Sequence, residues 1–185
     1  SAVYFNARLD ILNGTVAQFQ YFGLATKFRQ IAWAGRLDFN HMRPLQVSLL
    51  GEFVKNVGLD QTAMRNLNRA DPVVNNRSGG TGNWEGGDTA WYMGVNFGKP
   101  TTLFSERGDW AFGIGYRYVE SDAVVDGFTD SNFGGGGTNM KGYTLSAALA
   151  LSKKTALHLS YMSAAQIAGP TLRSDVIMFD LTARF

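Results

Sequence analysis

The eleven residues DVIMFDLTARF, 175–185, alternate between apolar and polar side chains. The apolar set is Ile177, Phe179, Leu181, Ala183 and Phe185, and the polar set is Asp180, Thr182 and Arg184. An apolar set that repeats every second residue lies on one face of a β-strand, whereas a helix would distribute it around its axis. The stretch therefore predicts a strand with one apolar and one polar face.

The same alternation recurs along the chain. Its clearest case is WAFGIGYRY, 110–118, where large apolar residues alternate with Ala, Gly and Arg. The other stretches with this pattern are 31–39, 45–53, 91–97, 143–151 and 157–161. A less regular alternation covers 3–11, and a second short run follows the Asn13-Gly14 turn. The sequence thus predicts seven strands and one or two more near the N-terminus.

Composition restricts the class of protein. A chain of 185 residues is expected to form one domain. The net charge of +2 provides no field for nucleic acid. The 22 glycines, 4 prolines and 13% aromatic residues suit strands and tight turns. Cysteine is absent, which excludes disulfides, thiolate metal sites and cysteine nucleophiles, and no apolar run approaches the roughly 18 residues of a membrane-spanning helix.

The lengths of the predicted strands and joints favour a membrane barrel. Most strands cover about 9 to 14 residues, whereas soluble strands average about five or six and membrane-spanning strands need about 9 to 11. In an up-and-down meander, the mostly longer joints 58–87, 124–138 and 165–174 fall at one end. The mostly shorter joints 40–44, 99–109 and 152–155 fall at the other end, with the C-terminus. Outer-membrane barrels have short periplasmic turns and long external loops.

The chemistry of the two faces follows from a bilayer. A closed barrel pairs its backbone groups between strands, so outward side chains must be apolar while inward ones can be polar. The predicted fold is therefore an all-β, antiparallel up-and-down transmembrane β-barrel, with about eight strands in this chain, either complete or as part of a larger barrel. The predicted lumen-lining residues are Arg36, Asp38, Glu52, Arg117, His158, Asp180 and Arg184. The predicted lipid-facing aromatic girdles are Phe39, Phe97, Trp110 and Phe185 near the turns, and Trp91, Tyr118, Tyr143 and Tyr161 near the loops.

A soluble β-sandwich is the alternative fold, since its strands also alternate between a core face and a water face. Three features disfavour it: the strand length, the charged fraction of 17%, and a second face made mostly of Gly, Ala, Ser and Thr. The surface of a soluble sheet normally carries more Lys and Glu.

Two stretches could carry other chemistry. Asp122, Asp126 and Asp130 could form a calcium clamp, but their spacing does not match a calcium-binding loop, and Asx turns explain them more simply. His158 and Ser160 share a face, yet side chains two apart on a strand are about 6.5 to 7 Å apart, and no orienting acid is evident nearby. We therefore expect no enzyme, no metal and no cofactor.

The C-terminal pattern, with Phe179, Leu181 and Phe185, resembles the assembly signal of bacterial outer-membrane barrels, which implies recognition by the barrel-assembly machinery. The segments FGLATKFRQIAWAGRLDF, GDTAWYMGVNFGK and FTDSNFGGGGTN are similar to the C-terminal part of the putative porin family of Gram-negative bacteria. The resemblance runs from about residue 22 to the end. Because members of that family are generally longer, it implies that residues 1–185 form either a single barrel domain or the C-terminal portion of a larger barrel.

The resemblance also implies a function. The protein is expected in the bacterial outer membrane as a porin, passing small hydrophilic solutes or ions through a polar lumen. The expected partners are outer-membrane lipid and lipopolysaccharide, the assembly machinery, and an oligomer or larger envelope complex, but no nucleic acid. The alternative is a small closed barrel that serves as a structural anchor or subunit, since eight strands close around a lumen that side chains fill.

Overall fold

The computed structural model describes residues 3–12, 15–41, 43–66, 76, 83–99 and 106–184. Two of its strands, β1 (Val3–Leu12) and β2 (Thr15–Leu24), form an antiparallel sheet of their own. The main sheet contains β3 (Gln30–Phe39), β4 (Gln46–Asn56), β5 (Thr89–Gly98), β6 (Trp110–Val119), β7 (Met140–Ser152), β8 (Thr155–Gln166) and β9 (Arg173–Ala183). Three short helical segments complete the described elements: α1 (Gln61–Asn66), η3 (Asp126–Phe128) and η4 (Phe133–Gly135).

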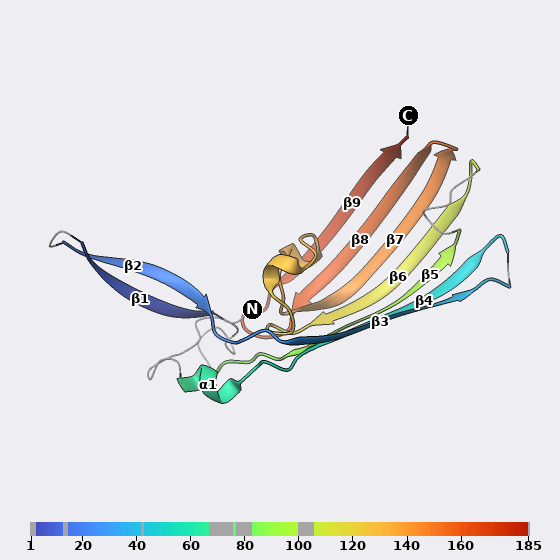
Figure 1. Ribbon diagram of the computed structural model, residues 1–185. Helices are drawn as coiled ribbons and strands as arrows, with labels where there is room; N and C mark the ends of the chain where they lie inside the picture. The colour runs from blue at the N-terminus through green and yellow to red at the C-terminus, as the bar shows by residue number, and fades with distance from the viewer. Residues whose placement is uncertain are drawn as a thin grey trace.

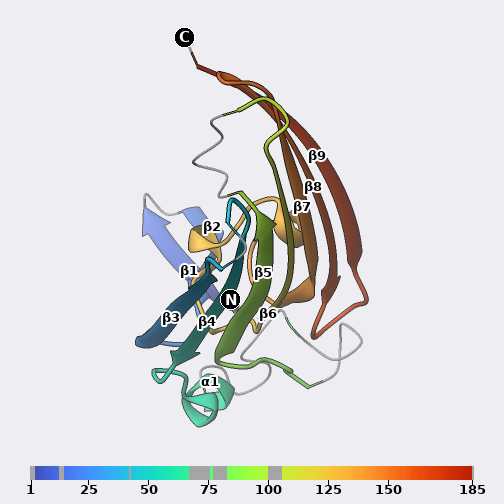
Figure 2. The ribbon, with the colours of Figure 1, turned by 90° about the vertical axis from the view of Figure 1, so that its right-hand side faces the viewer.

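The main sheet is an antiparallel meander. Each strand pairs with its neighbour in sequence, from β3 at one edge to β9 at the other (Figure 1). Figure 2 shows that the sheet curves into a trough, with the segment that contains η3 and η4 on its inner side. The prediction of an all-β up-and-down fold is confirmed. The sheet does not close on itself, and its form is that of part of a barrel wall. No helix in the described part of the chain is long and apolar enough to cross a membrane.

All seven strands predicted for the main part of the chain are present, and several are longer than the alternation shows. The strand predicted at 157–161 is β8, which continues to Gln166. The strand extends beyond its alternating segment because residues outside the apolar part of the sheet no longer need apolar side chains on the outer face, while their backbones continue to pair. The irregular N-terminal runs form β1 and β2, and the Asn13-Gly14 turn between them lies outside the described residues.

The joints divide between two ends of the sheet. The joints 40–45, 99–109 and 153–154 lie at what we call the turn end, where β9 also finishes (Figure 1). The joints 57–88, 120–139 and 167–172 lie at the loop end. The predicted loop at 165–174 is shorter in the structure because β8 and β9 continue pairing into it.

One glycine on the inner face has no space for a side chain. Gly142 pairs with Arg117 on β6 and Ala164 on β8, and a Cβ at this position would collide with the backbone oxygen of Ser163. Gly142→Ala is expected to destabilise the folded protein by about 1–3 kcal/mol, as overpacking does elsewhere. Urea titration in lipid vesicles measures the loss. The control is Gly127→Ala, where a Cβ meets open space, and equal stability of the two variants would contradict the strand register.

Candidate functional site

The outer, convex face of the main sheet is apolar and exposed. Most of the large hydrophobic side chains of the seven strands point to this face, and the exposed ones among them range from 37% exposure for Phe39 and Leu157 to 72% for Phe179. Soluble monomers rarely expose a contiguous apolar patch larger than a few hundred Å². The soluble-sandwich alternative is wrong, because it requires this face to be buried as a core.

Strand register aligns these side chains into uncharged rows. The central row consists of Leu37, Leu49, Val95, Ile114, Leu145, Tyr161 and Ile177. The next row toward the turn end consists of Phe39, Val47, Phe97, Phe112, Ala147, Leu159 and Phe179. We call these rows and the aromatic residues that border them the apolar belt. Toward the loop end, the first outward charges are Lys55, Lys141, Arg173 and Asp175, all beyond the central row.

The aromatic residues at the loop side of the belt follow an oblique line. Trp91 and Tyr118 are direct partners with rings stacked at 5.9 Å, and the same row reaches Ala165 on β8. Tyr143 lies one row closer to the turn end, and Tyr161 lies four residues from Ala165. Four residues of about 3.3 Å over three strand spacings of about 4.8 Å correspond to a tilt of roughly 40°. Membrane barrels have strands tilted by about 35–45°, so these side chains follow a plane that crosses tilted strands.

Of the girdle residues predicted near the turns, Phe39, Phe97 and Trp110 also point outward. Phe97 and Trp110 are in contact, with ring centroids 5.5 Å apart, and the ring of Phe39 lies edge-on to His41 at 6.3 Å. Of the predicted assembly signal, Phe179 and Leu181 are 72% and 66% exposed on the same face, while Phe185 lies outside the described residues. Its role in assembly stays a prediction.

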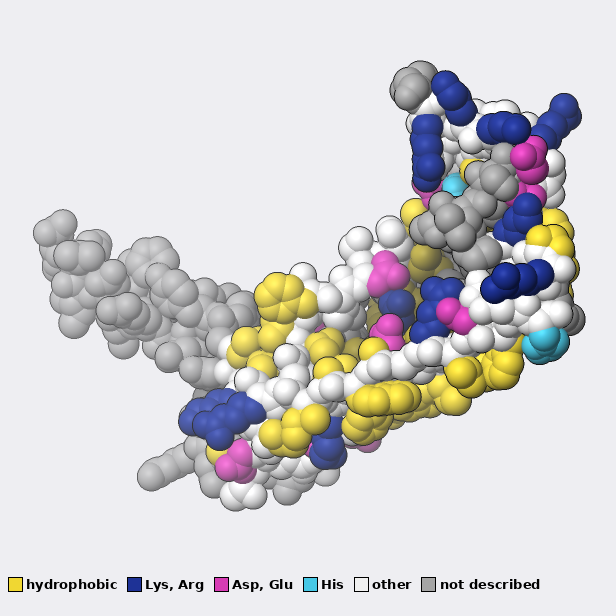
Figure 3. All heavy atoms as spheres, turned by 45° about the vertical axis from the view of Figure 1, so that its right-hand side comes forward, with side chains coloured by type: hydrophobic (Ala, Val, Ile, Leu, Met, Phe, Trp, Pro, Cys, Tyr) yellow, Lys and Arg dark blue, Asp and Glu magenta, His cyan; other side chains and the backbone are white. Residues whose placement is uncertain are grey.

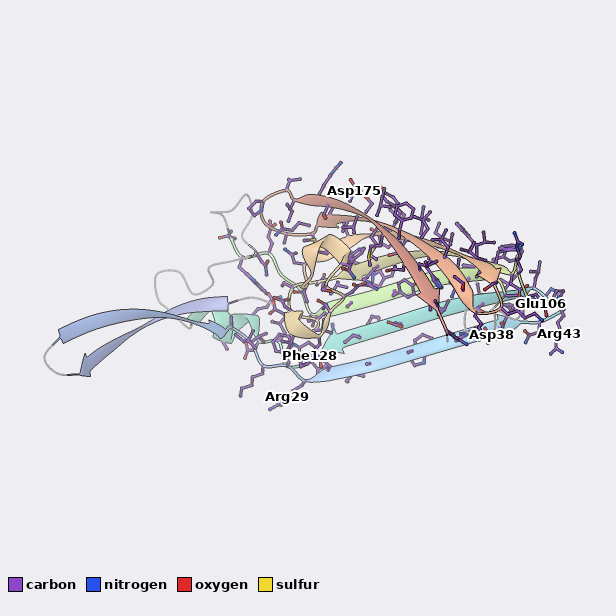
Figure 4. The ribbon with its side chains drawn as sticks, turned by 90° about the horizontal axis from the view of Figure 1, so that it is seen from above. Arg29, Asp38, Arg43, Glu106, Phe128 and Asp175 are labelled. Carbon is purple, nitrogen blue, oxygen red and sulfur yellow. The ribbon has the colours of Figure 1, made fainter. Side chains whose placement is uncertain are left out.

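The predicted lumen-lining residues lie on the opposite, concave face. Arg36, Asp38, Glu52, Arg117, His158 and Asp180 share it by strand register, and Arg184 follows the end of β9. Figure 3 shows charged side chains gathered in the hollow of this face, while hydrophobic side chains follow the outer flank. The labelled Asp38, Arg43 and Glu106 lie toward the turn end in Figure 4, and Arg29 and Phe128 toward the loop end.

The inner charges pair in part as the sequence suggests. The Nε of Arg36 lies 2.7 Å from Asp38, and a second guanidinium nitrogen donates to Ser48 at 3.2 Å. Asp180 lies directly across from His158, so an acid does adjoin this histidine, which the sequence analysis did not find. Among the described residues, no hydrogen bond joins His158 to Ser160 or to Asp180.

The joint 120–139, which we call the inner loop, folds back onto the concave face. Its Phe133 is only 3% exposed and packs with Met140, Met162 and Ala164. Val176 and Met178 on β9 pack against the same cluster. The inner loop therefore covers the loop-end half of β7, β8 and β9, as Figure 2 shows.

Arg117 on β6 ties the inner loop to the wall. Its guanidinium lies 3.3 Å from Asp130, 4.9 Å from the ring centroid of Phe133 and 5.9 Å from that of Tyr92. Cation–π contacts of this kind contribute about 0.5 to 2 kcal/mol each. The ring of Tyr92 lies flat against the sheet over Gly94 and Gly115. These glycines leave space for it, since a Cβ at either position would collide with the Tyr92 ring or hydroxyl. Arg117 is thus held between the wall and the loop.

Two buried asparagines fix the surroundings of the inner loop. Asn56, fully buried, donates to the backbone oxygens of Asp122 and Lys27 at 2.8 and 3.0 Å, and accepts from the Arg29 nitrogen at 2.8 Å. Asn139 donates to the Ala168 oxygen at 2.7 Å and accepts from its nitrogen at 2.9 Å. Buried amides that are satisfied in this way define one arrangement of the backbone.

The three loop aspartates contact separate groups. Asp122 accepts from Ser121 at 2.7 Å, Asp126 accepts from the Thr138 nitrogen at 3.1 Å, and Asp130 pairs with Arg117. Asp130 also accepts from the Asn132 nitrogen at 3.0 Å, as an Asx turn does. The carboxylates stabilise the turns of the inner loop and do not converge as a calcium clamp would require.

One carboxylate at the loop end, that of Asp88, has a lowered pKa. Burial alone would raise the pKa of Asp88, but hydrogen bonds from the Thr89 hydroxyl at 2.9 Å and the Lys55 ammonium at 3.1 Å outweigh it and lower the pKa. A lowered pKa in the folded state means that this contribution to stability is present near neutral pH and is lost as pH falls through the carboxyl range.

The turn-end half of the concave face contains an open polar hollow of about 290 Å³. Its lining includes Arg36, Gln46, Ser48, Asn96, Lys99, Ser146, His158 and Ser160, with Gly98, Ala111 and Ala148 between them. We call it the polar hollow. The inner loop and the polar hollow therefore occupy different halves of the same face.

Four residues of this face were not predicted as site residues from the sequence: Tyr92, Asn96, Lys99 and Phe133. Tyr92 had a local signal, since it is a large inward residue on a strand whose next inward position is Gly94. Phe133 had none, because its burial depends on β8 and β9, which come later in the chain.

A curved sheet of long antiparallel strands, with an uncharged outer belt and a polar inner face, is the wall of a membrane-embedded β-barrel. The chain belongs to the family described as "Putative porin", whose model matches residues 5–185. The match begins well before residue 22, so it also covers most of β1 and the part of β2 that the resemblance left out. No curated protein and no solved structure matched the chain.

Proposed function

We propose that the protein is an outer-membrane porin through which small hydrophilic solutes or ions diffuse passively. The observation that carries this proposal is the inner loop, held by Phe133, Arg117 and Asp130 on a polar concave face whose reverse side is apolar. An inward-folded segment narrows a lumen without filling it, and a narrowed polar passage is what size-limited diffusion needs.

The proposed mechanism has no chemical step and no cofactor. Solutes stay hydrated along the concave face because its strands present Ser, Thr, Asn and Gly between the charged side chains. The inner loop sets the cross-section in the loop-end half, and the polar hollow leaves space in the turn-end half. Arg36 and Arg117 each have a carboxylate partner on this wall, Asp38 and Asp130.

The proposed partners follow from the outer face. The apolar belt would contact the lipid of the outer membrane. Lys141 and Arg173, which point outward just beyond the belt, would approach lipopolysaccharide phosphates. The C-terminal strand β9 would be read by the barrel-assembly machinery. Association into an oligomer or envelope complex stays a prediction.

The alternative function, a small closed barrel acting as an anchor, would need β3 and β9 to pair with each other. In the described sheet these two strands are the opposite edges. The open trough therefore supports the porin proposal better than the anchor.

Reconstitution of the full-length protein into planar bilayers tests the proposal. We expect stepwise conductance, together with swelling of loaded liposomes in small sugars and no swelling in large ones. The control is protein that was heat-unfolded before addition. Folded protein in lipid that gives neither conductance steps nor swelling would contradict the porin function and favour an anchor.

A further inference from the structure

The charged side chains that line the polar hollow, among the described residues, are all positive. Its charged lining residues in the described part of the chain are Arg36 and Lys99, and its only other titratable lining group is His158. No carboxylate of the described residues lines it. Residues 100–105, which follow Lys99 and lie outside the described ranges, carry no charged side chain by sequence.

Both cations are held in place by carboxylates that lie outside the lining. Arg36 is paired with Asp38 at 2.7 Å, and Lys99 is paired with Asp109 at 2.6 Å. The second pair is well shielded, with side chains 21% and 10% exposed. Arg36 and Lys99 line the hollow, whereas their partners Asp38 and Asp109 do not. Because Lys99 is already held by its ion pair, its side chain loses little further freedom when an anion binds.

The floor between the cations consists of hydrogen-bonding groups. Ser48, Asn96 and Ser146 lie in one register row, and Gly113 in the same row leaves room for the last two. A Cβ at Gly113 would meet the Ser146 hydroxyl at 2.5 Å and the Asn96 side-chain oxygen at 2.6 Å. Hydroxyl and amide groups donate readily to phosphate and carboxylate oxygens.

We propose that the polar hollow is a binding subsite for small inorganic or organic anions of the phosphate or carboxylate type. A volume of about 290 Å³ admits such a solute with part of its hydration. The subsite lies on the turn side of the inner loop. This inference deepens the proposed function, because the subsite would lie along the solute path, but binding itself does not require transport.

The probe is inorganic phosphate. Binding is measured on the folded, detergent-solubilised full-length protein from the broadening of the ³¹P resonance, and transport from the reduction of single-channel current by added phosphate. Asn96→Asp places a carboxylate in the hollow without removing a cation or changing the size of the side chain. A unit charge a few ångströms from the ligand at partial solvent screening is expected to weaken binding on the order of tenfold. Lys99→Gln is expected to weaken it similarly.

The matched control is Gln61→Glu, which adds the same charge at an exposed residue of α1, at the other end of the molecule. The inference holds if phosphate binds to the native protein and to the control but about tenfold more weakly to Asn96→Asp, whether or not the protein conducts. The inference is overturned if phosphate does not bind to the native protein, or if Gln61→Glu weakens phosphate binding as much as Asn96→Asp does. Absence of conductance with binding intact would reject the porin proposal alone.

Discussion

Val95→Arg is expected to destabilise the folded protein in lipid by about 2–4 kcal/mol, the cost of an arginine on the lipid face of a barrel near the bilayer midplane. Val95 lies in the central row of the apolar belt, between Leu49 and Ile114, and is 38% exposed. An exposed valine in a soluble sheet would tolerate arginine, so the loss reports the lipid environment. Urea titration of protein folded into vesicles measures it.

The adjacent residue provides the control for this experiment. Asn96 is exposed on the concave face, between Ser48 and Gly113, and Asn96→Arg adds the same side chain to the same strand. We expect its stability to change by less than about 1 kcal/mol, as for solvated surface substitutions. Equal destabilisation by the two arginines would contradict the assignment of the two faces.

Phe133→Ala is expected to release the inner loop from the wall. Truncation of a buried phenylalanine costs about 3–5 kcal/mol, and here the ring also contacts the guanidinium of Arg117 at 4.9 Å. The strands keep their own pairing, so the loss falls on the loop. Under the proposed function, single-channel conductance increases, and liposomes swell in sugars that the native protein excludes.

The inner loop contains its own control. Phe128, in η3, is 88% exposed, and its side chain extends from the loop (Figure 4), so Phe128→Ala removes an equal ring without removing packing. Proteolysis within 126–137 gives a second readout that does not depend on conduction. Native-like conductance and native-like protease resistance in Phe133→Ala would contradict the role of this ring as the anchor of the loop.

The period-two pattern predicted the faces of the strands correctly, because lipid imposes a local rule on every second residue. Trp110, Ile114 and Phe179 point outward as the sequence indicates, and Arg117 points inward. Strand ends were less predictable. β8 continues to Gln166 although its alternation fades after Tyr161. Every second side chain needs to be apolar only where the strand faces lipid, and the strand itself is longer than that segment.

The candidate site was predictable only in its parity. Arg117 and Asp130 are 13 residues apart, and the sequence gives no reason for a loop aspartate to turn back toward that arginine. The sequence assigned Arg36 to the lumen, but Lys99 joins it only because the sheet curves and brings β3 and the end of β5 around one hollow.

By itself, therefore, the sequence determined that this protein is an antiparallel membrane sheet with one face for lipid and one for water. Alternation is a property of neighbouring residues and needs no knowledge of distant contacts. Only the tertiary structure decided that the inner loop covers β7–β9, and that two cations share a hollow that no carboxylate of the described residues lines. Those features depend on sheet curvature and on packing between residues far apart in the chain, which no local pattern encodes.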